Sequence, residues 1–156
     1  MLKFRIKRTW FIIFFILIAS CVNTKTSNES KDFSFIIGRF FGNYVPLEKV
    51  WVNKPESKYS ITYIDKKNLS MSEFNNIRHK LKKAGWREIS NQDNYYEYCL
   101  GEKMYMGVLY PIHKKHFNSK GLEVKYTNID NWLIGLSFGE GGVDYCKNDV
   151  EKIKLE

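Results

Sequence analysis

The first twenty residues limit what the rest of this chain can fold into. Residues 1–8 contain four basic residues and no acidic one, and ten apolar residues follow at 10–19. A basic stretch, a short apolar stretch and small residues before a break are typical of a secretory signal peptide. As a helix, ten residues measure about 15 Å, roughly half the hydrocarbon thickness of a bilayer, which disfavours a stable span. The alternative is an uncleaved signal anchor.

The end of this segment reads Ile18-Ala19-Ser20-Cys21, an aliphatic residue and two small residues before a cysteine. This pattern resembles the lipobox of bacterial lipoproteins. The resemblance implies removal of residues 1–20, lipidation of the Cys21 thiol and a membrane anchor of two or three acyl chains, which hold firmly where one would not. Val22, rather than Asp, follows the cysteine. In Gram-negative lipoproteins this implies the outer membrane, with the domain facing the periplasm.

The positive charge of the chain belongs partly to the predicted signal. The whole chain has 25 Lys and Arg against 17 Asp and Glu, a net charge of +8. Removing residues 1–20 takes away four basic residues and no acidic one, so the net charge falls to +4. A mildly basic domain in a compartment without nucleic acid gives no reason to expect a nucleic-acid partner.

Two further cysteines, Cys99 and Cys146, remain in the exported part. Because an exported domain meets an oxidising environment, we expect one structural disulfide between them. Two buried free thiols or a redox-active pair are the alternatives. Reactive dithiols usually occur as Cys-x-x-Cys, which disfavours the second of these.

Two helices are expected after a polar tether at residues 21–32. Residues 33–41 place apolar side chains at helical spacing, which favours a core-docking helix over a strand or a membrane-surface segment with too few cations. Residues 71–84 form the stronger helix, because Ser70 and Glu73 make a capping box and Gly85 supplies the stop. We also expect a short helix from about Asp149.

The remaining segments alternate apolar and polar residues or end at turn-rich separators, which indicates strands. The expected strands are Tyr59–Ile64, Trp86–Ile89, Tyr95–Leu100, Lys103–Ile112, Leu122–Thr127 and Trp132–Phe138. The sequence therefore predicts one α+β domain over 33–156, a curled antiparallel sheet of five or six strands with the helices on one face.

Catalytic and cofactor motifs are absent from the sequence: there is no P-loop, Gly-x-Gly-x-x-Gly, Gly-x-Ser-x-Gly or His-Glu-x-x-His. We expect no enzyme activity, no cofactor and no metal. Glu88 and Glu97 are the one acid pair that a hairpin places face to face, although surface solubility explains them equally well.

Two basic groups are candidate partner-binding residues. The first is a loop containing His113, Lys114, Lys115 and His116, and the second is Arg78 with Lys82 on the polar face of the main helix. Two histidines three residues apart can begin a metal site, but the lysines between them repel a cation. We therefore interpret the loop as a solvated basic surface suited to an acidic partner. His79 is expected to be solvated.

These features predict an envelope-anchored lipoprotein whose domain is a non-enzymatic binding module for another envelope protein. A periplasmic inhibitor or immunity protein that neutralises a toxin or hydrolase is the first alternative. An enzyme that cleaves cell-wall glycan or peptide with an unrecognised acid pair is the second.

Overall fold

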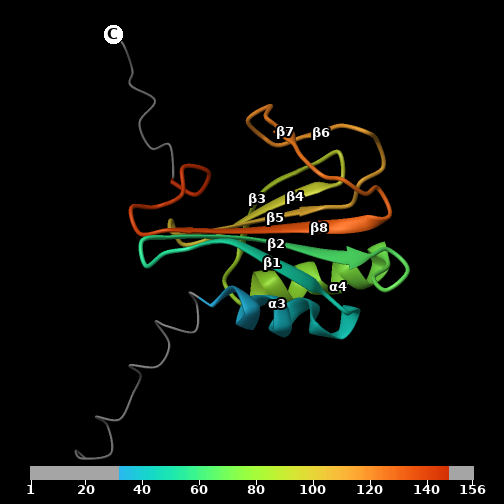
Figure 1. The fold of residues 1–156 in the computed structure, drawn as a ribbon, viewed down its shortest axis with the longest axis horizontal. Helices are drawn as coiled ribbons and strands as arrows, with labels where there is room; N and C mark the ends of the chain where they lie inside the picture. The colour runs from blue at the N-terminus through green and yellow to red at the C-terminus, as the bar shows by residue number, and fades with distance from the viewer. Residues whose placement is uncertain (1–31, 148–156) are drawn as a thin grey trace, which may run out of the picture. The chain divides into compact units, whose positions relative to one another are not determined.

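The computed structural model describes residues 32–147 (Figure 1). The predicted signal peptide, the lipobox, nearly all of the tether and the helix expected from about Asp149 lie outside these residues. Within the described range, no helix is both long and apolar enough to cross a membrane.

Six antiparallel strands form the main sheet in the order β1-β2-β8-β5-β4-β3. They are β1 (Leu47–Asn53), β2 (Ser57–Asp65), β3 (Arg87–Gln92), β4 (Tyr95–Leu100), β5 (Met104–Leu109) and β8 (Asn131–Gly139). A second sheet pairs β6 (His116–Phe117) with β7 (Glu123–Val124). Together with two helices, this arrangement confirms the predicted α+β class.

The two helices begin where the sequence places them. Helix α3 (Phe33–Phe41) starts at Asp32, whose side chain accepts a hydrogen bond from the Ser34 amide, and it leads into the short 3₁₀ helix η1 (Gly42–Tyr44). Helix α4 (Met71–Lys83) starts at Ser70 with the predicted capping box. The Ser70 hydroxyl accepts from the Glu73 amide at 3.2 Å, and Glu73 accepts from the Ser70 amide at 2.8 Å.

Both helices cover the same face of the sheet (Figure 1). Trp132 of β8 lies at the centre of this core with no exposed surface. Its ring packs 4.8 Å from Phe74 of α4 and 4.7 Å from Tyr110, and its indole N–H donates to the Leu69 carbonyl oxygen at 2.8 Å. Burying large aromatic rings with their polar atoms satisfied is the arrangement that stabilises such a core most.

The opposite face of the sheet is covered in part by β6, β7 and the segment after β8 (Figure 1). Cys99 of β4 and Cys146 after β8 meet on this side and are paired as a disulfide. The predicted pairing is therefore present, and it ties the end of the described chain to the sheet.

Several strand predictions differ from the structure. The strand expected at Lys103–Ile112 ends at Leu109, and β6 was not predicted. The prediction missed β1, whose residues do not alternate strictly because a bulge at Trp51 interrupts the pairing with β2. The strand expected at Leu122–Thr127 is reduced to the two residues of β7. The alternation in this segment nevertheless predicts which side chains are partly buried. Val124 and Tyr126 pack against the cluster of Tyr95, Leu109 and Leu133 on the second face of the sheet.

Candidate functional site

A cleft of about 620 Å³ lies between α4 and the start of β3. We call it the α4–β3 cleft, and its lining residues are Asn75, Arg78, His79, Lys82, Trp86, Glu88 and Tyr98. Two of the predicted partner-binding residues, Arg78 and Lys82, are therefore neighbours in one hollow. They lie one helical turn apart, so both point from the same flank of α4.

Arg78 is held in place by a carboxylate from the sheet. Its guanidinium donates to Glu88 of β3 at 2.9, 3.0 and 3.3 Å, and it stacks 4.7 Å from the ring centre of Tyr96. Burial opposes the charged form of Arg78, but the hydrogen bonds and charges of Glu88 and Tyr98 together outweigh burial, and the pKa of Arg78 is raised. A forked contact of this kind fixes the orientation of the side chain.

The floor of the cleft contains the buried hydroxyl group of Tyr98, which lies beside Glu88 and Arg78 without a well-formed hydrogen bond to either. Tyr98 is 2 % exposed, and its oxygen has no hydrogen-bond partner of good geometry among the described residues. Burial, reinforced by the nearby Glu88 charge, raises the pKa of Tyr98, so the hydroxyl is protonated at neutral pH. A buried unpaired hydroxyl is unfavourable, and a ligand atom in the cleft would relieve it.

The rim of the α4–β3 cleft is cationic. Lys82 and His79 are exposed, as predicted for His79, and no acidic side chain other than Glu88 lines the cleft. Because Arg78 is paired with Glu88, Lys82 is the lysine or arginine in the lining that has no ion pair within residues 32–147. The cleft is therefore suited to one anionic group that lies against Lys82 and reaches the Tyr98 hydroxyl.

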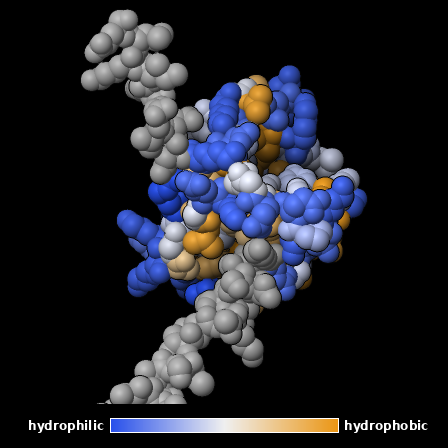
Figure 2. Space-filling view, turned by 90° about the vertical axis from the view of Figure 1, so that its left-hand side faces the viewer, coloured by the Kyte–Doolittle hydropathy of each residue, from blue (hydrophilic) through white to orange (hydrophobic). Residues whose placement is uncertain are grey.

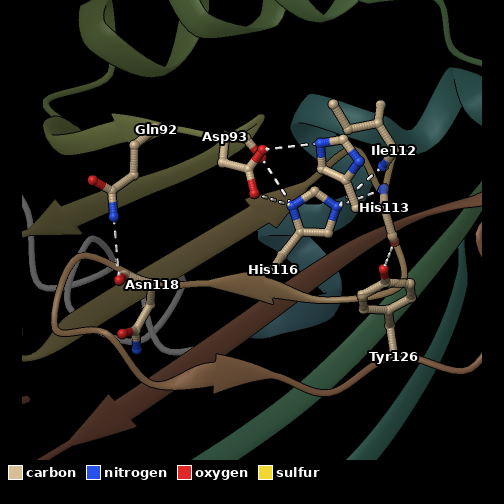
Figure 3. Close-up of polar contacts among 7 residues, drawn as sticks. All are labelled: Gln92, Asp93, Ile112, His113, His116, Asn118 and Tyr126. Atoms are coloured by element: carbon tan, nitrogen blue, oxygen red, sulfur yellow. Dashed lines mark hydrogen bonds and ion pairs between the residues drawn. The ribbon is translucent and has the colours of Figure 1, made fainter.

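The second candidate group surrounds a buried histidine (Figure 3). His116 Nε2 accepts hydrogen bonds from the backbone amides of Ile112 and His113, at 3.1 and 3.2 Å. Its Nδ1 lies 2.9 Å from Asp93 Oδ2 and 3.0 Å from the Asp93 carbonyl oxygen. These contacts assign the proton of a neutral imidazole to Nδ1, which donates to Asp93.

The expectation that this whole loop is solvated is wrong for His116, which has no exposed surface. Its partner Asp93 was not predictable from local spacing, because it lies 23 residues earlier, in the turn between β3 and β4, where its backbone is left-handed with φ of 50°. His113, Lys114 and Lys115 are exposed as expected. The His113 ring stacks on His116, with ring centres 5.5 Å apart.

The role of His116 is therefore to hold the loop that carries these exposed side chains. The Tyr126 hydroxyl fixes the same loop by donating to the His113 carbonyl oxygen, and Gln92 donates to the Asn118 carbonyl oxygen at 3.2 Å (Figure 3). The loop thus presents Lys114 and Lys115 from a fixed backbone.

We expect His116→Ala to release this loop without unfolding the sheet. The variant leaves the amides of Ile112 and His113 without a hydrogen-bond acceptor. This destabilises the loop by about 1–3 kcal/mol for each amide that water does not reach. Hydrogen exchange should rise by tenfold or more at these two amides and stay unchanged at Ile134 in β8. Equal exchange at positions 112 and 113 in the variant and the native protein would contradict this role.

The two candidate groups do not form one site. Arg78 binds Glu88 near the start of β3, whereas His116 binds Asp93 beyond the end of the same strand. Glu88 and Glu97 do not form the acid pair considered from the sequence either. Glu88 faces α4, but Glu97 lies on the other face of the sheet, where its oxygens accept from the Tyr105 hydroxyl and the Ser119 amide.

Among residues 32–147, no group of three or more histidine, cysteine or acidic side chains is placed to hold a metal ion. Searches of family models, curated proteins and solved structures found no match to this chain.

Proposed function

We propose that this chain is a lipoprotein of the bacterial cell envelope whose domain is a non-enzymatic binding module. The lipobox ending at Cys21 supports an acyl anchor, and Val22 supports the periplasmic side of the outer membrane. The disulfide geometry of Cys99 and Cys146 fits an oxidising compartment.

The α4–β3 cleft is the observation that carries the binding role. It combines an exposed ammonium group on Lys82, the exposed imidazole of His79 and a buried hydroxyl on Tyr98 that lacks a well-formed hydrogen bond. A carboxylate that enters the cleft gains a charge-assisted hydrogen bond from Lys82 and a second hydrogen bond from Tyr98. The proposed partner is an envelope protein that presents an aspartate or glutamate side chain to this cleft.

Site-specific crosslinking in cells tests this proposal. A photoreactive residue at position 79, on the rim of the cleft, should give one dominant crosslinked protein. The same residue at position 54, in the turn between β1 and β2, should not give that product. Lys82→Glu should lower the crosslink yield at position 79 by about tenfold, since an attractive contact becomes repulsive. Lys54→Glu is the matched control for the change in charge.

Three outcomes would contradict the proposal. One is a crosslink yield at position 79 that Lys82→Glu leaves unchanged. Another is a partner that crosslinks only from position 114, which would place the binding surface on the loop of Lys114 and Lys115. The third is turnover of purified peptidoglycan that is lost in Glu88→Gln, because this would make the domain an enzyme.

A further inference from the structure

The outward face of α3 contains an aromatic residue and a cation one helical turn apart. Phe35 is 44 % exposed, and Arg39 is also exposed, because α3 buries its other apolar side chains in the core. Positions i and i+4 are neighbours on a helix surface. An exposed aromatic ring beside an arginine is a common pair at a membrane interface, where the ring enters the headgroup layer and the cation binds phosphate. One cation on α3 is too few to bind a membrane surface.

Helix α4 supplies the missing charge from its other flank. Arg39 and Phe40 of α3 share a shallow groove of about 280 Å³ with Lys80, Lys83 and Ala84 of α4. We call Phe35, Arg39, Lys80 and Lys83 the basic helix surface. It brings together three cations that are far apart in the sequence.

Among residues 32–147, the acidic side chains closest in sequence to this surface are already hydrogen-bonded. Helix α3 contains none. Asp32 caps α3 by accepting from the Ser34 amide, and Glu48 of β1 accepts from the Ser34 hydroxyl at 2.7 Å. On α4, Glu73 lies in the first turn, within the capping box and at the far end from Lys80 and Lys83. The basic helix surface therefore keeps a net positive charge.

The predicted anchor limits how far the domain can lie from lipid. Cys21 precedes Phe33, the first residue of α3, by twelve residues. Twelve residues span at most about 40–43 Å, whatever conformation they adopt. The chain thus enters the domain through the helix layer, which lies on one face of the sheet (Figure 1).

We propose that the basic helix surface rests on anionic phospholipid headgroups of the membrane that holds Cys21, an inference that depends on the lipid anchor of the proposed function. Each cation close to an anionic surface strengthens its association several-fold. The end of the domain shown in Figure 2 is mostly hydrophilic, with small hydrophobic patches between polar residues. Of the four side chains of the basic helix surface only Phe35 is apolar, so contact through charge fits this surface better than deep insertion.

This orientation has a consequence for the rest of the molecule. The β6–β7 layer lies on the other side of the sheet from the helices (Figure 1) and therefore faces away from the membrane. The α4–β3 cleft lies on the flank of α4 that carries Arg78 and Lys82, so a partner in the cleft meets the domain beside the membrane.

Fluorescence quenching by spin-labelled lipids tests the orientation in the intact lipidated protein. A fluorophore is attached to Gly38→Cys, on the outward face of α3, where an added side chain meets no other atom within 4 Å. A second label, on Phe117→Cys in β6, is the reference. The protein is reconstituted in phosphatidylcholine vesicles with or without one third phosphatidylglycerol.

The label at position 38 should be quenched at least twofold more strongly in the anionic vesicles, and the label at position 117 should not respond. Lys80→Glu with Lys83→Glu should abolish the difference at position 38, as should 0.5 M salt. Lys114→Glu with Lys115→Glu makes the same change in charge away from the helices and should have no effect.

The intact mass of the same sample separates the two proposals. If quenching at position 38 is equal in neutral and anionic vesicles and the lipid mass is present, the proposed orientation is contradicted but the lipid anchor is not. A chain without added lipid mass would contradict the anchor itself, and the orientation would fall with it.

Discussion

Replacing Cys99 and Cys146 together with alanine is expected to lower the free energy of unfolding by about 4 kcal/mol. The two residues are 47 apart in the sequence, so their bond closes a long loop and removes much of the conformational entropy of the unfolded chain. Both side chains are about 1 % exposed. Alanine is therefore a better substitute than serine, because serine would bury a hydroxyl group. Chemical denaturation without reductant measures the change.

Reduction of the native protein provides the control. Dithiothreitol should shift the denaturation midpoint of the native chain toward that of the Cys99→Ala, Cys146→Ala variant and leave the variant unchanged. A native midpoint that does not move when the thiols are shown to be reduced would contradict a stabilising bond. The expected loss is a large part of the total stability of a domain of this size.

The second large effect is expected from Gly107→Ala, at about 3 kcal/mol of destabilisation. Gly107 of β5 lies under the ring of Tyr95, and a methyl group there would be 2.1 Å from the Tyr95 hydroxyl oxygen. That hydroxyl lies 2.9 Å from the Tyr105 hydroxyl, which donates to the buried Glu97 at 2.7 Å. Moving Tyr95 therefore breaks a buried hydrogen-bond network that includes a carboxylate.

Gly135→Ala is a matched control, because Gly135 of β8 pairs directly with Gly107 and an added methyl group meets no other atom within 4 Å. This variant should stay within about 0.5 kcal/mol of the native stability. Burial raises the pKa of both Tyr95 and Tyr105, so their hydroxyls are protonated at neutral pH. Similar denaturation midpoints for the two alanine variants would contradict the steric argument.

Local signals made the helices predictable. The Ser70 and Glu73 capping box gave the start of α4, and the apolar spacing of residues 33–41 gave α3. Both signals involve residues within one or two helical turns of each other, where sequence spacing determines which side chains meet. Strand β1 lacked such a signal, because the bulge at Trp51 breaks its alternation and leaves apolar residues exposed at the sheet edge.

The site was only partly predictable, because its residues come from elements far apart in the chain. The sequence pointed to Arg78 and Lys82, but Glu88 and Tyr98 join them only through the pairing of β3 with β4. The buried state of His116 depends in the same way on the turn at Asp93. Helical spacing carries no information on contacts of this kind, which follow from the strand order and register.

Intact-mass analysis of the native protein extracted from membranes tests the central claim, that the domain is carried by a lipid anchor on Cys21. The expected mass is that of residues 21–156 with one diacylglycerol, with or without one further acyl chain, and two hydrogens fewer for the disulfide. A chain that begins at Met1 and carries no lipid mass would contradict the envelope lipoprotein, and both proposals built on its anchor.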